Sequence, residues 1–317
     1  MTGYWPYRIA AFLSRALPER LAYWVGLRFS DLFYRFDPRG RAAVKGNLAR
    51  IFSAQGVRPA EQVLDGFARK TFQYFGKYLV DFFRFSRLTP EDIRERVSIE
   101  HQDYFDQAMA MQRGVVLVSA HFGNWEIGGA VIAGLGCTVN AVVLPQRLEK
   151  LNRLFQGQRE RRGLRVIPMG SSAFNLIRCL KRKECLALVA DRDFTGTSDP
   201  VEFFGRPAHM PVGPARLSWK TGAPVLAGFL IREVDDTFLL RFYPPILPEN
   251  EESMDALRRR INVILEKEIA ERPYQWFIFD PFWEIKPVAG GAKERTAGPA
   301  FDAAGKNDYP PREGTNP

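Results

Sequence analysis

A histidine and a glutamate lie five positions apart in the stretch SAHFGNWEIGG, residues 119–129. An imidazole held by a carboxylate keeps its other nitrogen free to take a proton from a hydroxyl, so His121 and Glu126 are candidates for acid–base chemistry. On one straight helix they would point about 140° apart, so they can meet only if the chain turns between them. Gly123 and Asn124 are residue types that permit such a turn. The alternative is a structural His121, as a helix cap or a satisfied core residue.

Other familiar catalytic patterns are missing from the sequence. It contains no GxSxG, GxxxxGK[ST], GxGxxG or HExxH, and the KTG at 220–222 has no accompanying SxxK. The cysteines, Cys137, Cys179 and Cys185, lack CxxC spacing and nearby histidines, which argues against a zinc site or a disulfide framework and fits a reducing cytoplasm. A nucleophilic serine and nucleotide binding therefore have no support.

The histidine follows one of several short apolar runs that predict strands. Runs of Val, Leu and Ile without alternation are typical of strands buried on both faces, and helical periods lie between the early ones. We therefore expect an α/β fold with a largely parallel central sheet flanked by helices, in which the last two strands pair as an antiparallel hairpin. Ligands of such sheets bind at the carboxyl ends of the strands, where His121 lies. The predicted strands are 115–119, 138–144, 164–169, 185–190, 224–231 and 237–243.

The N-terminal segment, residues 1–36, is rich in Trp, Tyr, Phe and Arg. Helical periodicity gathers its first apolar residues on one arc, with Arg8 and Arg15 at the border. No apolar stretch approaches the ~18 residues of a spanning helix, and no signal peptide is recognisable. Such a stripe suits the lipid interface, although it can also pack in a core. The arc consists of Trp5, Ile9, Phe12, Leu13, Ala16 and Leu17.

Composition divides the rest of the chain. Residues 37–285 are expected to form the α/β domain, whereas residues 286–317 are rich in Gly, Pro and Ala and are expected to be a disordered tail. The formal net charge is +9, which favours an anionic partner such as a membrane surface, an acidic protein or a nucleic acid. The amphipathic start favours the membrane, and we expect no nucleic-acid partner.

Several segments together resemble a known family. HFGNWE matches the HX4(D/E) signature of glycerolipid-type acyltransferases, and VADRDFTG with VEFFGRPAHMPVGPARLSWKTGAPVL resembles the lipid A biosynthesis (late) acyltransferases and their phosphatidylinositol mannoside acyltransferase relatives. The resemblance extends from residue 1 to about 285 and includes NLARIF and PYQWFIF. It implies a glycerolipid acyltransferase-like fold and an enzyme bound peripherally to the cytoplasmic face of the bacterial inner membrane.

The resemblance also implies a reaction and roles for single residues. The enzyme would move a fatty acyl chain from acyl carrier protein or acyl-CoA to a hydroxyl of a glycolipid, such as a lipid A precursor or a mannosylated phosphoinositide. His121 would be the base, and either Glu126 or Glu202 would be its partner. The DRD triplet departs from the DxD with Gln or His of many lipid A enzymes, which favours the mannoside branch and leaves the acceptor open. The residues expected to bind substrate are Asn124, Arg159, Asp191, Arg192, Asp193 and Gly205.

A thioester donor simplifies the chemistry that the site must perform. Because the thioester is already activated, the enzyme has only to deprotonate the alcohol, hold it near the carbonyl and stabilise the oxyanion. We therefore expect no metal or redox cofactor, with the acyl thioester as co-substrate. Two alternatives stay open: an acyltransferase acting on a lysophospholipid or aminolipid, and a nonenzymatic lipid-binding protein on the same fold.

Overall fold

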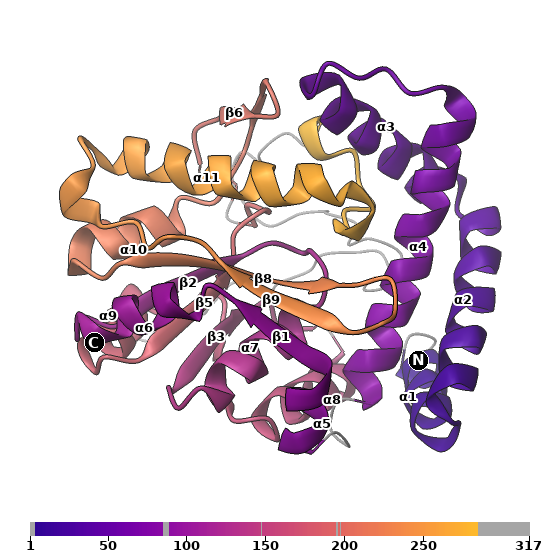
Figure 1. Ribbon diagram of the computed structural model, residues 1–317, viewed down its shortest axis with the longest axis horizontal. Helices are drawn as coiled ribbons and strands as arrows, with labels where there is room; N and C mark the ends of the chain where they lie inside the picture. The colour runs from indigo at the N-terminus through magenta and orange to yellow at the C-terminus, as the bar shows by residue number, and fades with distance from the viewer. Residues whose placement is uncertain (1–3, 85–88, 147, 195, 197, 285–317) are drawn as a thin grey trace, which may run out of the picture.

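A seven-stranded sheet forms the centre of the computed structural model, which describes residues 4–84, 89–146, 148–194, 196 and 198–284 (Figure 1). The tail expected at 286–317 lies outside these residues. The strand order is β1-β9-β8-β2-β5-β3-β4, and β6 and β7 form a separate hairpin. The strands are β1 (Val97–Glu100), β2 (Val115–Ser119), β3 (Val139–Val143), β4 (Leu164–Pro168), β5 (Cys185–Val189), β6 (Val201–Phe203), β7 (Arg206–Ala208), β8 (Val225–Arg232) and β9 (Phe238–Phe242).

The six predicted strands are confirmed as β2, β3, β4, β5, β8 and β9, to within one residue at each end. β8 and β9 pair antiparallel as expected, and the other pairs in the large sheet are parallel. β1, β6 and β7 were not predicted, because each is only three or four residues long and carries polar residues. The fold is therefore α/β with a largely parallel central sheet.

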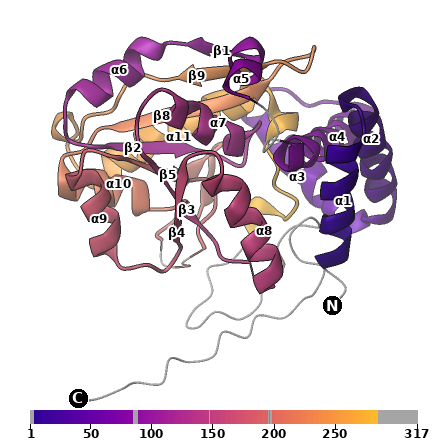
Figure 2. The ribbon, with the colours of Figure 1, turned by 90° about the horizontal axis from the view of Figure 1, so that it is seen from below.

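Helices cover both faces of this sheet, and Figure 2 shows α6 and α9 on opposite sides of it. Alternate side chains of β2 enter different cores: Val115 and Leu117 pack with α6 and α7, whereas Val116 and Val118 pack with α10 and α11. The helices are α1 (Tyr4–Ala16), α2 (Glu19–Phe36), α3 (Pro38–Ala54), α4 (Glu61–Arg84), α5 (Pro90–Arg96), α6 (Gln102–Ala110), α7 (Trp125–Gly134), α8 (Glu149–Glu160), α9 (Ala173–Lys181), α10 (Gly213–Thr221) and α11 (Met254–Glu271), with short 3₁₀ turns at Pro248–Asn250, Pro273–Gln275 and Phe282–Glu284.

The first four helices form a layer at one end of the molecule, where α2 runs along the outer side of α4 (Figure 1). Glycines let the two helices approach closely: a Cβ at Gly76 would lie 2.0 Å from Oγ of Ser30, and one at Gly26 would lie 2.9 Å from Cγ2 of Val80. On its other side α4 packs against the body, where Tyr78 stacks on Trp125 with ring centroids 4.4 Å apart. The helix α4 therefore connects α2 with the residues that follow β2.

Large apolar side chains on the outer surface of α1 and α2 are exposed, and we call them the apolar face. On α1 part of the expected arc points outward, since Ile9 is 56% and Phe12 is 69% exposed, whereas Leu17 packs against Ala22 and Tyr23 of α2. No helix in the described part of the chain is long and apolar enough to cross a membrane. The apolar face consists of Ile9, Phe12, Leu21, Trp24, Phe29, Leu32, Phe33 and Phe36.

Candidate active site

His121 and Asp191 follow two neighbouring strands at their carboxyl ends. β2 and β5 are parallel, with Ser119 opposite Val189, and the two site residues each come two positions later. The register of the sheet therefore places them side by side. Nδ1 of His121 lies 2.7 Å from Oδ1 of Asp191, and the backbone N–H of His121 donates to Oδ2 at 2.9 Å. The carboxylate thus engages one ring nitrogen and leaves Nε2 for other chemistry.

Asp191 is completely buried, whereas the side chain of His121 remains 23% exposed. The indole N–H of Trp276 donates to Oδ2 of Asp191 at 2.8 Å. Burial alone would raise the pKa of Asp191, but the charge of His121 and hydrogen bonds from His121 and Trp276 outweigh it and hold the pKa below its usual value. An ionised carboxylate in this position stabilises the protonated imidazole, as a general base requires.

The turn that presents His121 is fixed by its backbone. Gly123 has φ +57°, and a Cβ there would lie 2.0 Å from the carbonyl oxygen of Leu230, so only glycine fits. Its N–H donates to the carbonyl of Gln275 at 2.9 Å, and the N–H of Asn124 donates to that of Leu230 at 2.8 Å. The Asn124 side chain then accepts from the N–H of Ile127 and caps α7. The predicted turn is confirmed, and its asparagine begins a helix.

Glu126 does not reach His121. Because α7 begins at Trp125, the Glu126 side chain leaves the helix toward α8, where it forms a bidentate ion pair with Arg159. Both side chains are nearly buried, with 8% and 15% exposed. Burial lowers the pKa of Arg159, but the Glu126 carboxylate outweighs this and leaves the pKa above its usual value. Glu126 and Arg159, both expected to serve the site, therefore bond to each other and not to His121.

Glu202 is also separate from His121. It lies on β6 with an exposed side chain, opposite Pro207 of β7. Gly205 occupies the turn between these strands with φ +67°, and Arg50 donates to the carbonyl of the preceding residue. Across the described residues, Glu202 makes no hydrogen bond or ion pair. The expectation that Glu126 or Glu202 partners His121 is therefore corrected: the carboxylate that does so is that of Asp191, two residues after β5.

The other two residues of the DRD triplet bond to residues other than His121. Arg192 donates to Asp280 at 2.9 Å, and Asp193 accepts from the backbone N–H and hydroxyl of Ser198. Burial raises the pKa of Asp280, although Arg192 partly offsets this. Among the described residues, no group of three or more His, Cys, Asp or Glu side chains is placed to hold a metal ion.

Three residues of the segment PYQWFIF form hydrogen bonds with the site. The sequence did not predict this role. Gln275 accepts from Gly123, Trp276 donates to Asp191, and Phe277 donates its backbone N–H to the carbonyl of His121 at 2.8 Å. The only signal in the sequence was the resemblance of this segment to its family counterpart. Its contribution depends on contacts between positions more than 80 residues apart, which local patterns do not encode.

Comparisons with known proteins identify the family of the chain. The sequence profile described as bacterial lipid A biosynthesis acyltransferase matches residues 1–284. The chain belongs to this family. It is 30% identical over 289 residues to the phosphatidylinositol mannoside acyltransferase of Mycobacterium tuberculosis (strain CDC 1551 / Oshkosh), covering 88% of both chains. It is 27% identical to the protein of the same name in Mycolicibacterium smegmatis, with 90% of this chain and 91% of that one covered.

A member of the lipid A branch is also similar. The lipid A biosynthesis palmitoleoyltransferase of Escherichia coli K12 is 23% identical over 274 residues, with 86% of this chain and 88% of that one covered. Among solved structures, the 1-acyl-sn-glycerophosphate acyltransferase of Thermotoga maritima matches 78% of this chain and 97% of its own, with a TM-score of 0.37 and 15% identity. As a family member, the chain is an acyltransferase that transfers groups other than aminoacyl groups.

Proposed function

We propose that this acyltransferase moves a fatty acyl chain from a thioester, carried by acyl carrier protein or coenzyme A, to a hydroxyl of a membrane glycolipid. The observation that carries the proposal is the pair formed by His121 and the buried, ionised Asp191 at the carboxyl end of the sheet. The names of the similar proteins add the acceptor class, namely mannosylated phosphoinositides or lipid A precursors. No metal or redox cofactor takes part in the proposed reaction.

His121 acts as the general base in the proposed step. Nε2 takes the proton of the acceptor hydroxyl while the oxygen attacks the thioester carbonyl, and the resulting imidazolium is stabilised by Asp191. Collapse of the tetrahedral intermediate expels the thiolate, which receives the proton from His121. An ester is formed and a thiol is released, so the imidazole returns to its starting state.

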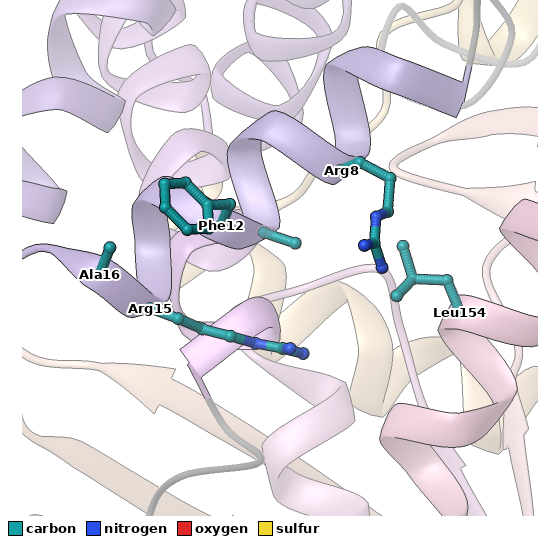
Figure 3. Close-up of a pocket in the computed structure, with 6 residues that line it drawn as sticks. Arg8, Phe12, Arg15, Ala16 and Leu154 are labelled. Atoms are coloured by element: carbon teal, nitrogen blue, oxygen red, sulfur yellow. The ribbon is translucent and has the colours of Figure 1, made fainter.

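The proposed location is the cytoplasmic face of the bacterial inner membrane, with the apolar face of α1 and α2 in contact with lipid. Aromatic side chains such as Phe12, Trp24 and Phe36 favour the headgroup region, which is partly apolar and partly wet. A pocket of about 200 Å³ between α1 and α8 adjoins this face. Figure 3 shows the guanidinium group of Arg8 extending from α1 toward Leu154 at this pocket, which Arg15 also lines, so its charge suits an anionic lipid headgroup.

Acyl carrier protein, an acidic acyl donor, would suit a second surface, on α9. On α9, Phe174, Arg178 and Lys181 are spaced by four and three residues, so they share one helix face, and all three are exposed. No ion pair involving Arg178 or Lys181 occurs within the described ranges. In both views α9 lies far from α1 and α2 (Figures 1 and 2), so a carrier protein docked there would not compete with the membrane for the same surface.

A panel of donors and acceptors tests the proposed function. Purified protein is incubated with acyl-CoA or acyl carrier protein, each with a mannosylated phosphoinositide, a lipid A precursor, a lysophospholipid or an aminolipid, and products are identified by mass spectrometry. We expect an acylated glycolipid with wild type and none with His121→Ala. A lysophospholipid product alone would replace the proposed acceptor, and wild-type inactivity with every pair would contradict the proposal.

A further inference from the structure

A buried ion pair joins the N-terminal helices to the turn of the active site. Asp81 of α4 bonds Arg232, the last residue of β8, and their side chains are only 7% and 3% exposed. Two charges taken out of water are costly unless further hydrogen bonds satisfy them, so their partners indicate what the pair does. These partners come from α2, from the residue that caps α7, from the turn after β8, where Asp236 also pairs with Arg232, and from the segment after α11.

The Asp81 carboxylate accepts hydrogen bonds from three parts of the chain. Its Oδ1 accepts the hydroxyl of Tyr23 from α2 at 2.5 Å. Its Oδ2 accepts from the side-chain amide of Asn124 at 3.1 Å and from a guanidinium N–H of Arg232. Asn124 stands three residues after His121 and caps α7, so Asp81 reaches the active-site turn through one intervening side chain.

Arg232 reaches the same turn by a second route. Its backbone N–H donates to the side chain of Gln275 at 3.0 Å, and the Gln275 amide donates back to the Arg232 carbonyl at 2.8 Å. The Gln275 carbonyl accepts from Gly123 at 2.9 Å. The two residues of the ion pair therefore reach two consecutive turn residues: Asp81 bonds Asn124 directly, and Arg232 reaches Gly123 through Gln275.

We propose that Asp81, Arg232 and Tyr23 are positioning residues that couple the seating of α2 to the geometry of the His121 turn. The proposal rests on the proposed role of His121 as general base. Because α2 also carries part of the apolar face, a lipid surface that stabilises α2 against α4 stabilises the Asp81 contacts as well. Membrane contact then raises the fraction of molecules in which His121 is correctly placed beside Asp191.

Loss of the Tyr23 hydroxyl has a definite physical effect. Oδ1 of Asp81 would lose its tyrosine donor in a buried site, so the carboxylate would move to recover hydrogen bonding and would hold Asn124 less firmly. Asn124 fixes the start of α7 through the N–H of Ile127, so a shift there changes the path of the chain back to His121. Asp191 keeps its hydrogen bond from Trp276, so the shift mainly alters the position of His121 relative to Asp191.

The chain offers a matched control in α2 itself. Tyr34 is as buried as Tyr23, at 7% and 8% exposed, and its hydroxyl donates to another α4 carboxylate, that of Asp65, at 2.6 Å. Asp65 also pairs with Lys45, near the surface and away from the turn. Tyr23→Phe and Tyr34→Phe therefore each remove one hydroxyl that joins α2 to α4, but only the first acts on the network that contains Asn124.

Kinetics in vesicles of phosphatidylglycerol and phosphatidylethanolamine give the first test. We expect Tyr23→Phe to lower kcat about 2- to 10-fold, the equivalent of one net hydrogen bond, with the KM of the acceptor unchanged. Tyr34→Phe should keep the wild-type kcat even where its melting temperature falls equally. Equal kcat values for the two variants, or a change in KM alone, would overturn the coupling.

Hydrogen exchange gives a second test that needs no turnover. The peptide containing 121–125 should exchange faster in Tyr23→Phe than in wild type or Tyr34→Phe, and the same vesicles should slow its exchange in wild type more than in Tyr23→Phe. An active wild type without these differences would refute the coupling while the proposed function stands. An inactive wild type with these differences would leave the coupling intact and refute the proposed function.

Discussion

Nδ1 of His121 and Oδ1 of Asp191 lie 2.7 Å apart although 70 positions separate the two residues. The carboxylate is fully buried and its pKa is held below its usual value, while the imidazole keeps an exposed edge. This combination suits a base that accepts a proton from a substrate at one nitrogen while a fixed charge supports the other.

His121→Ala should reduce turnover by about 10²- to 10⁴-fold, the usual contribution of general-base catalysis. Donor binding, measured by calorimetry with acyl-CoA, should change little, because the side chain acts on the acceptor proton. His101→Asn is the matched control, since His101 is exposed and its φ of +60° is one that asparagine tolerates. Near-normal turnover in His121→Ala would refute the mechanism.

Asp191→Asn should lower kcat by about 10⁴-fold if Asp191 acts as a triad aspartate does, because an amide favours the wrong imidazole tautomer. A lowered pKa means that the ionised carboxyl stabilises the folded state fully above its ordinary pKa of about 3.9, and that this stability is lost as pH falls through the lower, folded value. Urea unfolding should therefore show the stability gap between wild type and Asp191→Asn shrinking below about pH 4. A gap that widens toward acid would show that Asp191 is not ionised in the folded protein.

Glu126→Gln should act mainly on stability. It leaves the Arg159 guanidinium nearly buried without its carboxylate, and breaking such a pair costs roughly 3 kcal/mol. We expect a clear fall in melting temperature with a smaller loss of kcat than in Asp191→Asn. The exposed Glu202→Gln should leave the melting temperature unchanged. A Glu202→Gln enzyme that loses turnover as severely as Asp191→Asn would restore the role that the resemblance implied for this glutamate.

Substitution of the apolar face should weaken membrane binding. We expect the combined change of Phe12, Trp24, Phe29 and Phe36 to Ser to reduce vesicle partitioning at least about tenfold, since burial of one phenylalanine contributes about 1.5–3 kcal/mol. Phe174→Ser, an exposed aromatic elsewhere, is the control, and liposome flotation is the measurement. Unchanged flotation would exclude this face as the anchor.

Deletion of residues 1–36 also weakens flotation if the segment anchors the protein. It is a less specific test, because α2 buries Tyr23 and Tyr34 against α4 and its removal uncovers that surface. The point substitutions keep these buried contacts, so they separate loss of the anchor from damage to the fold.

Charge reversal on α9 should distinguish the two donors. Arg178→Glu with Lys181→Glu is expected to raise the KM for acyl carrier protein severalfold and to leave the KM for acyl-CoA nearly unchanged, because exposed charges act mainly on protein association. The wild-type reaction with the carrier protein should also slow as salt rises, since exposed charges are screened over about 8 Å at physiological ionic strength. Arg58→Glu with Arg259→Glu, exposed in the loop between α3 and α4 and on α11, controls for net charge. An equal effect from this control would exclude α9 as the docking surface.

The sequence was sufficient to predict the elements with strong local patterns. Runs such as VVLVS predicted their strands, and Gly123 predicted the turn. Burial and backbone conformation restrict the residue types at neighbouring positions, so these features can be recognised locally. The partner of His121 could not be predicted in this way. Asp191 lies next to it only because β5 is the neighbour of β2, and strand order depends on the whole chain. Glu126 was nearer in sequence, but helix α7 turns it toward Arg159.

The in-register pairing of β2 with β5 links folding and catalysis in one structural detail. A chain that paired these strands one residue out of step would turn alternate side chains to the opposite face and would carry His121 away from Asp191. Such a molecule would still be compact and rich in strands, but it would be inactive. After recovery from denaturant, the turnover per folded molecule therefore counts the chains in which these two strands have found their proper alignment.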